Sequence, residues 1–157
     1  MFHHRILSLG AAALILTATT LSAGSHSGDL PAPVKARHGQ MQLYAFNLGT
    51  LGAMAKGEVA YDAEAASAAA ANLLALATLN AGPMWAPGTD SDSLDGSRAL
   101  PAIWENFPDV GAKAGAMVEA ATAMNAAAGN GLDALQAAMG PVGGACGGCH
   151  KVYRAEE

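Results

Sequence analysis

Four alanine-rich segments, separated by clusters of Gly, Pro, Asn and Asp, constrain the fold of this chain more than any other feature. Within each segment the larger apolar residues recur at three- and four-residue steps, which is the spacing of one buried face on an α-helix. Alanine side chains allow neighbouring helices to approach closely, and aromatic residues make up only 5% of the chain. No segment shows the strict alternation of a β-strand. The pattern predicts an all-α fold.

The four segments give the expected helices, which are Ala32 to about Lys56, Ala63 to Leu79, Pro108 to Ala128 and Leu132 to Arg154. Asp62 is the expected N-cap of the second helix, and Lys56 with Gly57 is the expected end of the first. Pro141 removes a backbone donor inside the fourth helix, so we expect a kink or a break there. Two short connections and one long surface link, residues 81–101, predict an antiparallel four-helix bundle.

Residues 1–23 have the layout of a secretory signal peptide. A basic start with Arg5 precedes an apolar run from Ile6 to Leu16, and small residues follow up to Ala23. We therefore expect cleavage that leaves one domain, residues 24–157, in the periplasm without stable membrane insertion. The alternative, an uncleaved membrane anchor, needs a longer apolar run than this one.

The net charge limits the classes of partner. The formal charge is −5 and becomes about −6 when Arg5 leaves with the signal peptide. Phosphate backbones and anionic lipids repel an acidic domain, so nucleic acid is not an expected partner. An acidic cluster in the long link, Asp90, Asp92 and Asp95, lacks the closing Glu of a calcium loop, and we expect a solvated loop there.

The sequence Cys-Gly-Gly-Cys-His at positions 146–150 has the C-x-x-C-H pattern of covalent haem attachment. The two thiols, Cys146 and Cys149, can add to the two vinyl groups of a porphyrin, and the imidazole of His150 can ligate its iron. Positions i, i+3 and i+4 of a helix share one face, so all three side chains can point at one planar ligand. Gly147 and Gly148 cost about 1 kcal/mol each in a helix, so we expect its last turns to need the haem. The motif predicts one covalently attached haem c.

Two other uses of the cysteines stay open. A C-x-x-C pair can be a redox dithiol, although such pairs begin a helix after a strand, and no strand is visible here. Zinc needs four ligands, and the histidines that remain after the signal are His26 and His38. The sequence has no recognisable nucleophile–base pair or pair of carboxylates, so we expect no enzyme activity.

The position of the motif near the C-terminus, in Cys-Gly-Gly-Cys-His-Lys-Val-Tyr-Arg, resembles the class II c-type cytochromes, the cytochrome c′ family. Other strings are similar to this family as well: Val34-Lys35-Ala36-Arg37 with Met41 four residues on, Ala55-Lys56-Gly57-Glu58, and Pro101-Ala102-Ile103-Trp104. The resemblance implies a four-helix bundle with the haem between its helices and His150 as the proximal iron ligand. It also implies, in many members, a homodimer through the first two helices.

Arg37 and Met41 take their expected roles from this resemblance. Arg37 matches a position near the haem edge, where a guanidinium can pair with a propionate. Met41 matches the distal position, which faces the sixth site of the iron. A ligating Met sulfur favours electron transfer with redox partner proteins, whereas a residue that only covers the site leaves the iron open to NO or CO. His38 follows Arg37 by one position, so we expect it to face away from the haem toward solvent.

Overall fold

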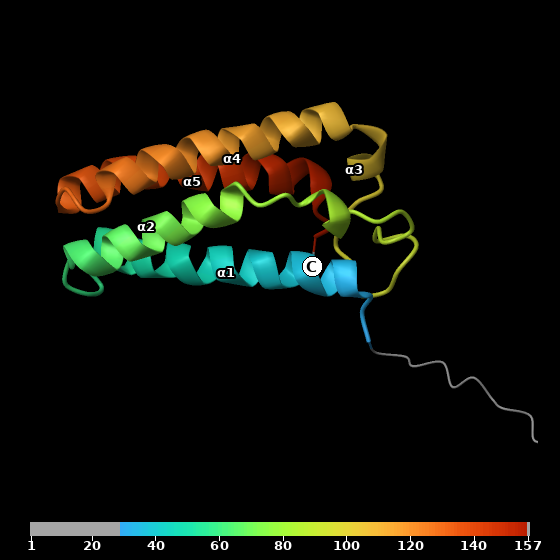
Figure 1. Cartoon of the computed structure of the whole chain (residues 1–157), viewed down its shortest axis with the longest axis horizontal. Helices are drawn as coiled ribbons and strands as arrows, with labels where there is room; N and C mark the ends of the chain where they lie inside the picture. Colours follow the sequence, from blue (N-terminus) through green and yellow to red (C-terminus); the bar gives the residue numbers. More distant parts are fainter. Residues whose placement is uncertain (1–28, 157) are drawn as a thin grey trace, which may run out of the picture.

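The computed structural model describes residues 29–156, and the expected signal peptide, residues 1–23, lies outside them. The elements are α1 (Ala32–Ala55), α2 (Ala63–Ala77), a 3-10 turn η1 (Gly82–Met84), α3 (Ala102–Glu105), α4 (Phe107–Ala127) and α5 (Leu132–Tyr153). Each of the long helices α1 and α4 packs against both α2 and α5, which confirms the predicted antiparallel four-helix bundle (Figure 1). Among the described residues, no helix is long and apolar enough to cross a bilayer.

The helix ends follow the local signals in the sequence. The carboxylate of Asp62 accepts hydrogen bonds from the backbone N–H groups of Glu64 and Ala65, both at 2.9 Å, and so caps α2. Gly57 has a φ of +74° directly after the last residues of α1, a conformation that a side chain would strain. Asn106 caps α4 through the N–H of Asp109. These ends agree with the predicted ones to within about two residues.

Helix α5 continues through Pro141, so the expected break is wrong. Pro141 and Ala137, whose carbonyl loses its donor to the proline, both lie on the exposed face of the helix. Water can hydrate that carbonyl, which removes most of the cost of the missing hydrogen bond. The opposite face, with Leu135, Ala138 and Val142, is buried and stays uninterrupted.

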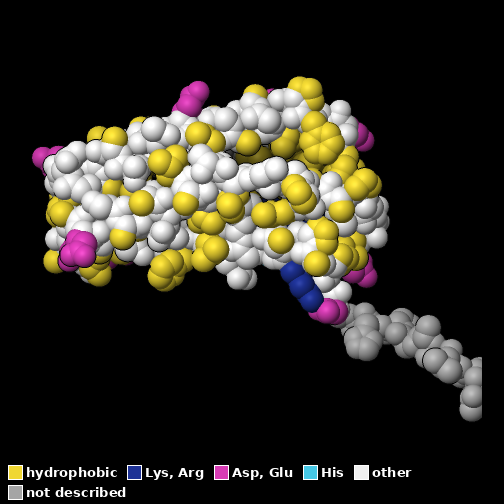
Figure 2. Space-filling model, viewed as in Figure 1, with side chains coloured by type: hydrophobic (Ala, Val, Ile, Leu, Met, Phe, Trp, Pro, Cys, Tyr) yellow, Lys and Arg dark blue, Asp and Glu magenta, His cyan; other side chains and the backbone are white. Residues whose placement is uncertain are grey.

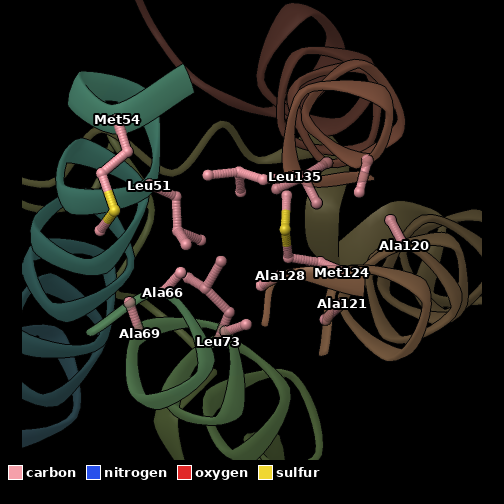
Figure 3. Close-up of a cluster of buried hydrophobic side chains, with 13 residues drawn as sticks. Leu51, Met54, Ala66, Ala69, Leu73, Ala120, Ala121, Met124, Ala128 and Leu135 are labelled. Carbon is pink, nitrogen blue, oxygen red and sulfur yellow. The ribbon is translucent and has the colours of Figure 1, made fainter. Parts of the chain in front are cut away.

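The densest core lies in the half of the bundle that holds the α1–α2 and α4–α5 turns, residues 51–73 and 120–142, which we call the turn half. Leu51, Leu73, Met124 and Leu135 meet there from the four long helices (Figure 3). Tyr61 joins the two turns, because its hydroxyl donates to the carbonyl of Ala128 at 2.8 Å and accepts from the N–H of Gly131 at 2.9 Å. Alanines fill the space between the large side chains and let the helices lie close together.

The other half contains the start of α1, the long connection, the start of α4 and the end of α5, and we call it the open half (residues 29–44, 78–116 and 145–156). The connection was expected to be a surface link, but it forms η1 and buries Thr89 and Ser97. Helix α3 follows it directly. On the face of the molecule shown in Figure 2, hydrophobic side chains are scattered among other uncharged side chains and backbone, with only a few charged groups. Elements as short as η1 and α3 carry too few residues for a periodic pattern, so the sequence did not predict them.

Candidate functional site

A hollow of about 330 Å³ lies in the open half, which is within the usual size range of ligand pockets. Helix α1 contributes Arg37, His38, Met41 and Gln42 to its wall, and the end of α5 contributes Cys149, His150, Tyr153 and Arg154. The long connection and α3 supply Trp85, residues 97–99 and Ile103. The hollow therefore brings together four of the five residues that the sequence singled out, and Cys146 lies one turn earlier on α5.

Cys146 and Cys149 lie in the last turns of α5, where both are half-buried and neither forms a disulfide. Burial raises the pKa of both thiols, although Lys113 opposes the rise at Cys149. A redox dithiol needs the opposite, a lowered pKa at the positive N-terminal end of a helix. These cysteines lie at the C-terminal end of one. The environment therefore favours the thioether role over the dithiol alternative.

His150 is half-buried beside Cys149. Burial lowers the pKa of its imidazole, and the positive charges of Arg154 and Arg98 lower it further. The ring is then neutral at neutral pH, and a neutral imidazole has the nitrogen lone pair that a metal requires. For the zinc alternative, residues 29–156 offer no cluster of three His, Cys, Asp or Glu side chains that could hold a metal ion. His26 lies outside the described residues.

Arg37 is buried, with 4% of its surface exposed, and it fastens the long connection to α1. Its Nη1 donates to the carbonyl of Met84 at 2.6 Å and to Oγ1 of Thr89 at 2.9 Å, and its Nη2 donates to the carbonyl of Thr89 at 2.9 Å. The guanidinium also lies over the ring of Trp85, 4.8 Å from the centroid. Arg37 is therefore not a solvated cation at a helix start, and much of its binding capacity serves the fold.

Met41 and His38 lie one helical turn apart on α1, and both line the hollow. Met41 keeps 42% of its surface exposed, so its thioether is outside the packed core. His38 is half-buried, and the expectation that it faces away from the hollow is wrong. The hollow touches α1 at positions 37, 38, 41 and 42. These positions occupy a broader arc of the helix than the single stripe that the sequence predicts to face the site.

Tyr153 and Asp109 form a contact that could not be predicted from the sequence. The hydroxyl of Tyr153 donates to Oδ2 of Asp109 at 2.7 Å, and Nζ of Lys113 lies 3.7 Å from the same oxygen. This hydrogen bond and burial raise the pKa of Tyr153 to about 12. The contact ties the end of α5, one turn after Cys149, to the first turn of α4. It thereby holds the proposed haem-bearing turn in place.

These residues fit a covalently attached haem. Two free thiols three residues apart on one helical face match the two thioether links, and the adjacent neutral imidazole matches an axial ligand. Three arginines, Arg37, Arg98 and Arg154, line the hollow, and their positive charge suits the two propionates of a haem. Trp85, Ile103 and Val110 provide apolar wall for the porphyrin.

Comparison with known proteins agrees with this chemistry. The family model described as Cytochrome C′ matches residues 32–154. Cytochrome c-554 of Cereibacter sphaeroides is 48% identical over 124 residues, which cover 79% of this chain and 81% of that protein. The solved cytochrome c′ of Rhodobacter sphaeroides is 43% identical with a TM-score of 0.77, and the match covers 80% of this chain and 96% of that one.

A second solved structure is also similar to this chain. It is a ferrous variant of cytochrome c′ from Alcaligenes xylosoxidans with bound NO, 32% identical with a TM-score of 0.69, and the match covers 80% of this chain and 94% of that one. The family model spans nearly all of the described residues, including both cysteines and His150. The chain therefore belongs to the cytochrome c′ family, whose members carry one covalently attached haem c.

Proposed function

We propose that this protein is a periplasmic electron carrier whose haem iron is ligated by His150 and Met41. The observation that carries the proposal is that Met41 of α1 and His150 of α5 line the same hollow from two different helices. The thioether of Met41 and the imidazole of His150 would then both be available as ligands of the haem iron. Coordination then changes little on reduction, which favours fast electron exchange with a redox partner protein.

The haem supplies the redox chemistry, and this chain's residues hold it. Cys146 and Cys149 would hold the porphyrin through thioether links, and His150 would ligate its iron. Arg37 uses three of its five N–H groups on Met84 and Thr89, which leaves two for a propionate at the haem edge. The predicted signal peptide, residues 1–23, supports export of the domain 24–157 to the periplasm. We propose no enzymatic turnover, because the role proposed for these residues is to hold a redox-active haem.

The visible spectrum of the purified holoprotein tests this function. It is recorded oxidised and then reduced, before and after addition of CO. We expect sharp α and β bands in the reduced protein that CO does not change, and in the oxidised protein the far-red band of a sulfur-ligated ferric haem. A broad reduced band that shifts with CO would contradict ligation by Met41.

Gas binding is the second candidate function, and the exposure of Met41 favours it. A side chain with 42% of its surface exposed and no place in the packed core can move away from the iron without disrupting the bundle. The relative from Alcaligenes xylosoxidans was solved with NO on its ferrous form. In this alternative Met41 covers a vacant site, and NO or CO binds to the reduced iron.

We also propose a homodimer through α1 and α2. Leu43 and Phe46 keep 52% and 71% of their surfaces exposed on α1, so two large apolar side chains of this helix remain in contact with water. A second copy of the chain would remove this apolar surface from water. Light scattering coupled to gel filtration should give a dimer for the native protein and a monomer for Phe46→Lys. A native monomer at micromolar concentration would contradict the proposal.

A further inference from the structure

His38 is an imidazole in the wall of the hollow that the proposed function does not use. It is half-buried, and among the residues that the structure describes it makes no hydrogen bond, ion pair or ring contact. Most of the polar side chains around it differ in this respect. Arg37 is bonded to Met84 and Thr89, Tyr153 is bonded to Asp109, and Arg98 donates to the carbonyl of Ala155. His38 thus has unused binding capacity in the wall of the hollow where the haem is expected.

The spacing between His38 and Met41 allows both side chains to approach one metal. Residues i and i+3 of a helix have Cβ atoms about 5–6 Å apart on the same side. Helix bundles use this spacing for metal ligands, as in the Glu-x-x-His pairs of di-iron proteins. In this chain, Cys146 and Cys149 have the same spacing and the same expected ligand. The residues that carry the imidazole and the thioether, His38 and Met41, lie less than one helical turn apart along α1.

We propose that His38 is a second distal ligand of the haem iron, which binds through an imidazole nitrogen when the sulfur of Met41 leaves. The inference rests on the proposed haem site with His150 as proximal ligand. It goes beyond the proposed function because it assigns a second ligand to the distal face. His38 would then fill the site that Met41 leaves, so that one of these two side chains would exclude gases from the distal face in both states. Loss of the thioether ligand should also lower the reduction potential, because Met raises the potential of haem iron.

Removal of the thioether is the direct test, using Met41→Ala holoprotein. Met41 lies outside the packed core, so the bundle should tolerate this change. We expect reduced Met41→Ala to keep sharp low-spin bands and to ignore CO, the oxidised form to lose the far-red sulfur band, and electron paramagnetic resonance to show the pattern of two imidazole ligands. The matched control is Lys35→Ala, which removes an exposed side chain of the same helix that does not line the hollow and should leave a wild-type spectrum.

The double variant Met41→Ala, His38→Ala isolates the imidazole. We expect it to be high-spin and to bind CO, and we expect added free imidazole to restore the low-spin spectrum. High-spin, CO-binding iron in Met41→Ala itself would overturn the inference, and so would low-spin iron that persists in the double variant.

The wild type and His38→Ala separate this inference from the proposed function. If Met41 is the resident ligand, both proteins show the far-red sulfur band. If the wild type already binds CO, the proposal that Met41 ligates the iron is wrong. The spectrum of Met41→Ala then still shows whether His38 can reach the iron. A His38→Ala protein that alone becomes high-spin would contradict the Met41 assignment while supporting His38 as a ligand.

Discussion

The two halves of the bundle are held together in different ways. In the turn half, Leu51, Leu73, Met124 and Leu135 are fully buried, and the four long helices meet mainly through apolar contacts (Figure 3). In the open half the helices enclose a hollow, and hydrogen bonds join the elements around it. Arg37 holds the long connection, and Tyr153 holds the start of α4.

This difference shows how a small helical protein can keep space for a large ligand. A packed core would close the hollow, since apolar side chains collapse onto one another. Polar contacts at the rim fix the walls without filling the interior. Backbone contacts add to them: the N–H of Leu100 donates to the carbonyl of Tyr153 at 3.0 Å, and the N–H of Ala155 donates to the carbonyl of Arg98 at 2.9 Å. Stability and ligand chemistry therefore reside in separate halves of one domain.

The largest effect should come from removing both thiols, because the open half then loses its haem. Cys146→Ala, Cys149→Ala protein should carry no covalent haem in a denaturing gel stained for haem peroxidase activity. Its far-ultraviolet circular dichroism should show weaker helicity, because Gly147 and Gly148 favour unfolding of the last turns of α5 without the haem. The turn half should remain helical.

A matched variant tests the role of the glycines. A Cβ atom at position 147 or 148 meets no other group within 4 Å. Adding Gly147→Ala and Gly148→Ala to the double cysteine variant should therefore restore helicity, because alanine favours the helix over glycine by about 1 kcal/mol per residue. Unchanged helicity in the double cysteine variant would show that the helix does not depend on the haem.

Leu135→Ala should have the next largest effect, on the turn half alone. Leu135 is fully buried, and truncation of such a side chain costs about 2–5 kcal/mol because it leaves a cavity. Urea denaturation of the holoprotein measures this loss, and the visible spectrum should not change. The control is Leu79→Ala, the same substitution at a side chain that is 49% exposed, where we expect a change within about 0.5 kcal/mol. An altered haem spectrum in Leu135→Ala would mean that the two halves are coupled.

The sequence predicted the turn half better than the open half. The long helices come from periodic patterns of more than a dozen residues, and their ends come from local signals such as Asp62 and Gly57. The haem motif is also local, because five consecutive residues carry it. Each of these features depends on neighbours within about one helical turn, so a sequence contains all the information that they require.

The open half depends on contacts between distant parts of the chain. Arg37 bonds to Thr89 across 52 positions, and Tyr153 bonds to Asp109 across 44. No local pattern marks such pairs. A single helical stripe facing the site predicts that His38 lies at the surface. The hollow instead touches a wider arc of α1, which includes His38. The break predicted at Pro141 follows from the general rule for prolines inside helices. That rule does not consider on which face the proline lies, and Pro141 lies on the exposed face.

Arg37→Ala should weaken the open half by a moderate amount. The change removes three charged hydrogen bonds and leaves the carbonyl of Met84 without a donor, whereas the carbonyl of Thr89 keeps the hydroxyl of Ser97, so the loss should be about 2–3 kcal/mol in urea denaturation. Amide hydrogen exchange should rise in residues 84–89 and stay unchanged in the turn half. Lys35→Ala removes an exposed cation from the same helix, one that pairs with Asp29, and should cost less than about 1 kcal/mol. Equal losses in the two variants would contradict the fastening role of Arg37.

The smallest effect should be the response of Tyr153→Phe to alkaline pH. Because the folded state raises the pKa of Tyr153 from 10.0 to about 12, it holds this proton more tightly than the unfolded chain does. The stabilisation is therefore fully present below about pH 10 and is lost as pH rises toward 12. Urea denaturation at pH 8, 10 and 11 should show a shallower decline in Tyr153→Phe than in the native protein.

Tyr44 provides the internal comparison for this pH series. Burial, with a smaller contribution from Cys146, raises the pKa of Tyr44 to about 12 as well. Tyr44→Phe should therefore also flatten the alkaline decline, but its phenol makes no hydrogen bond in the described residues, so at pH 8 it should be the more stable of the two variants. If Tyr153→Phe matched Tyr44→Phe at pH 8, the bond to Asp109 would contribute nothing to the rim. The open half would then rely on the hydrogen bonds of Arg37, Arg98 and Trp104 and on the backbone contacts around the hollow.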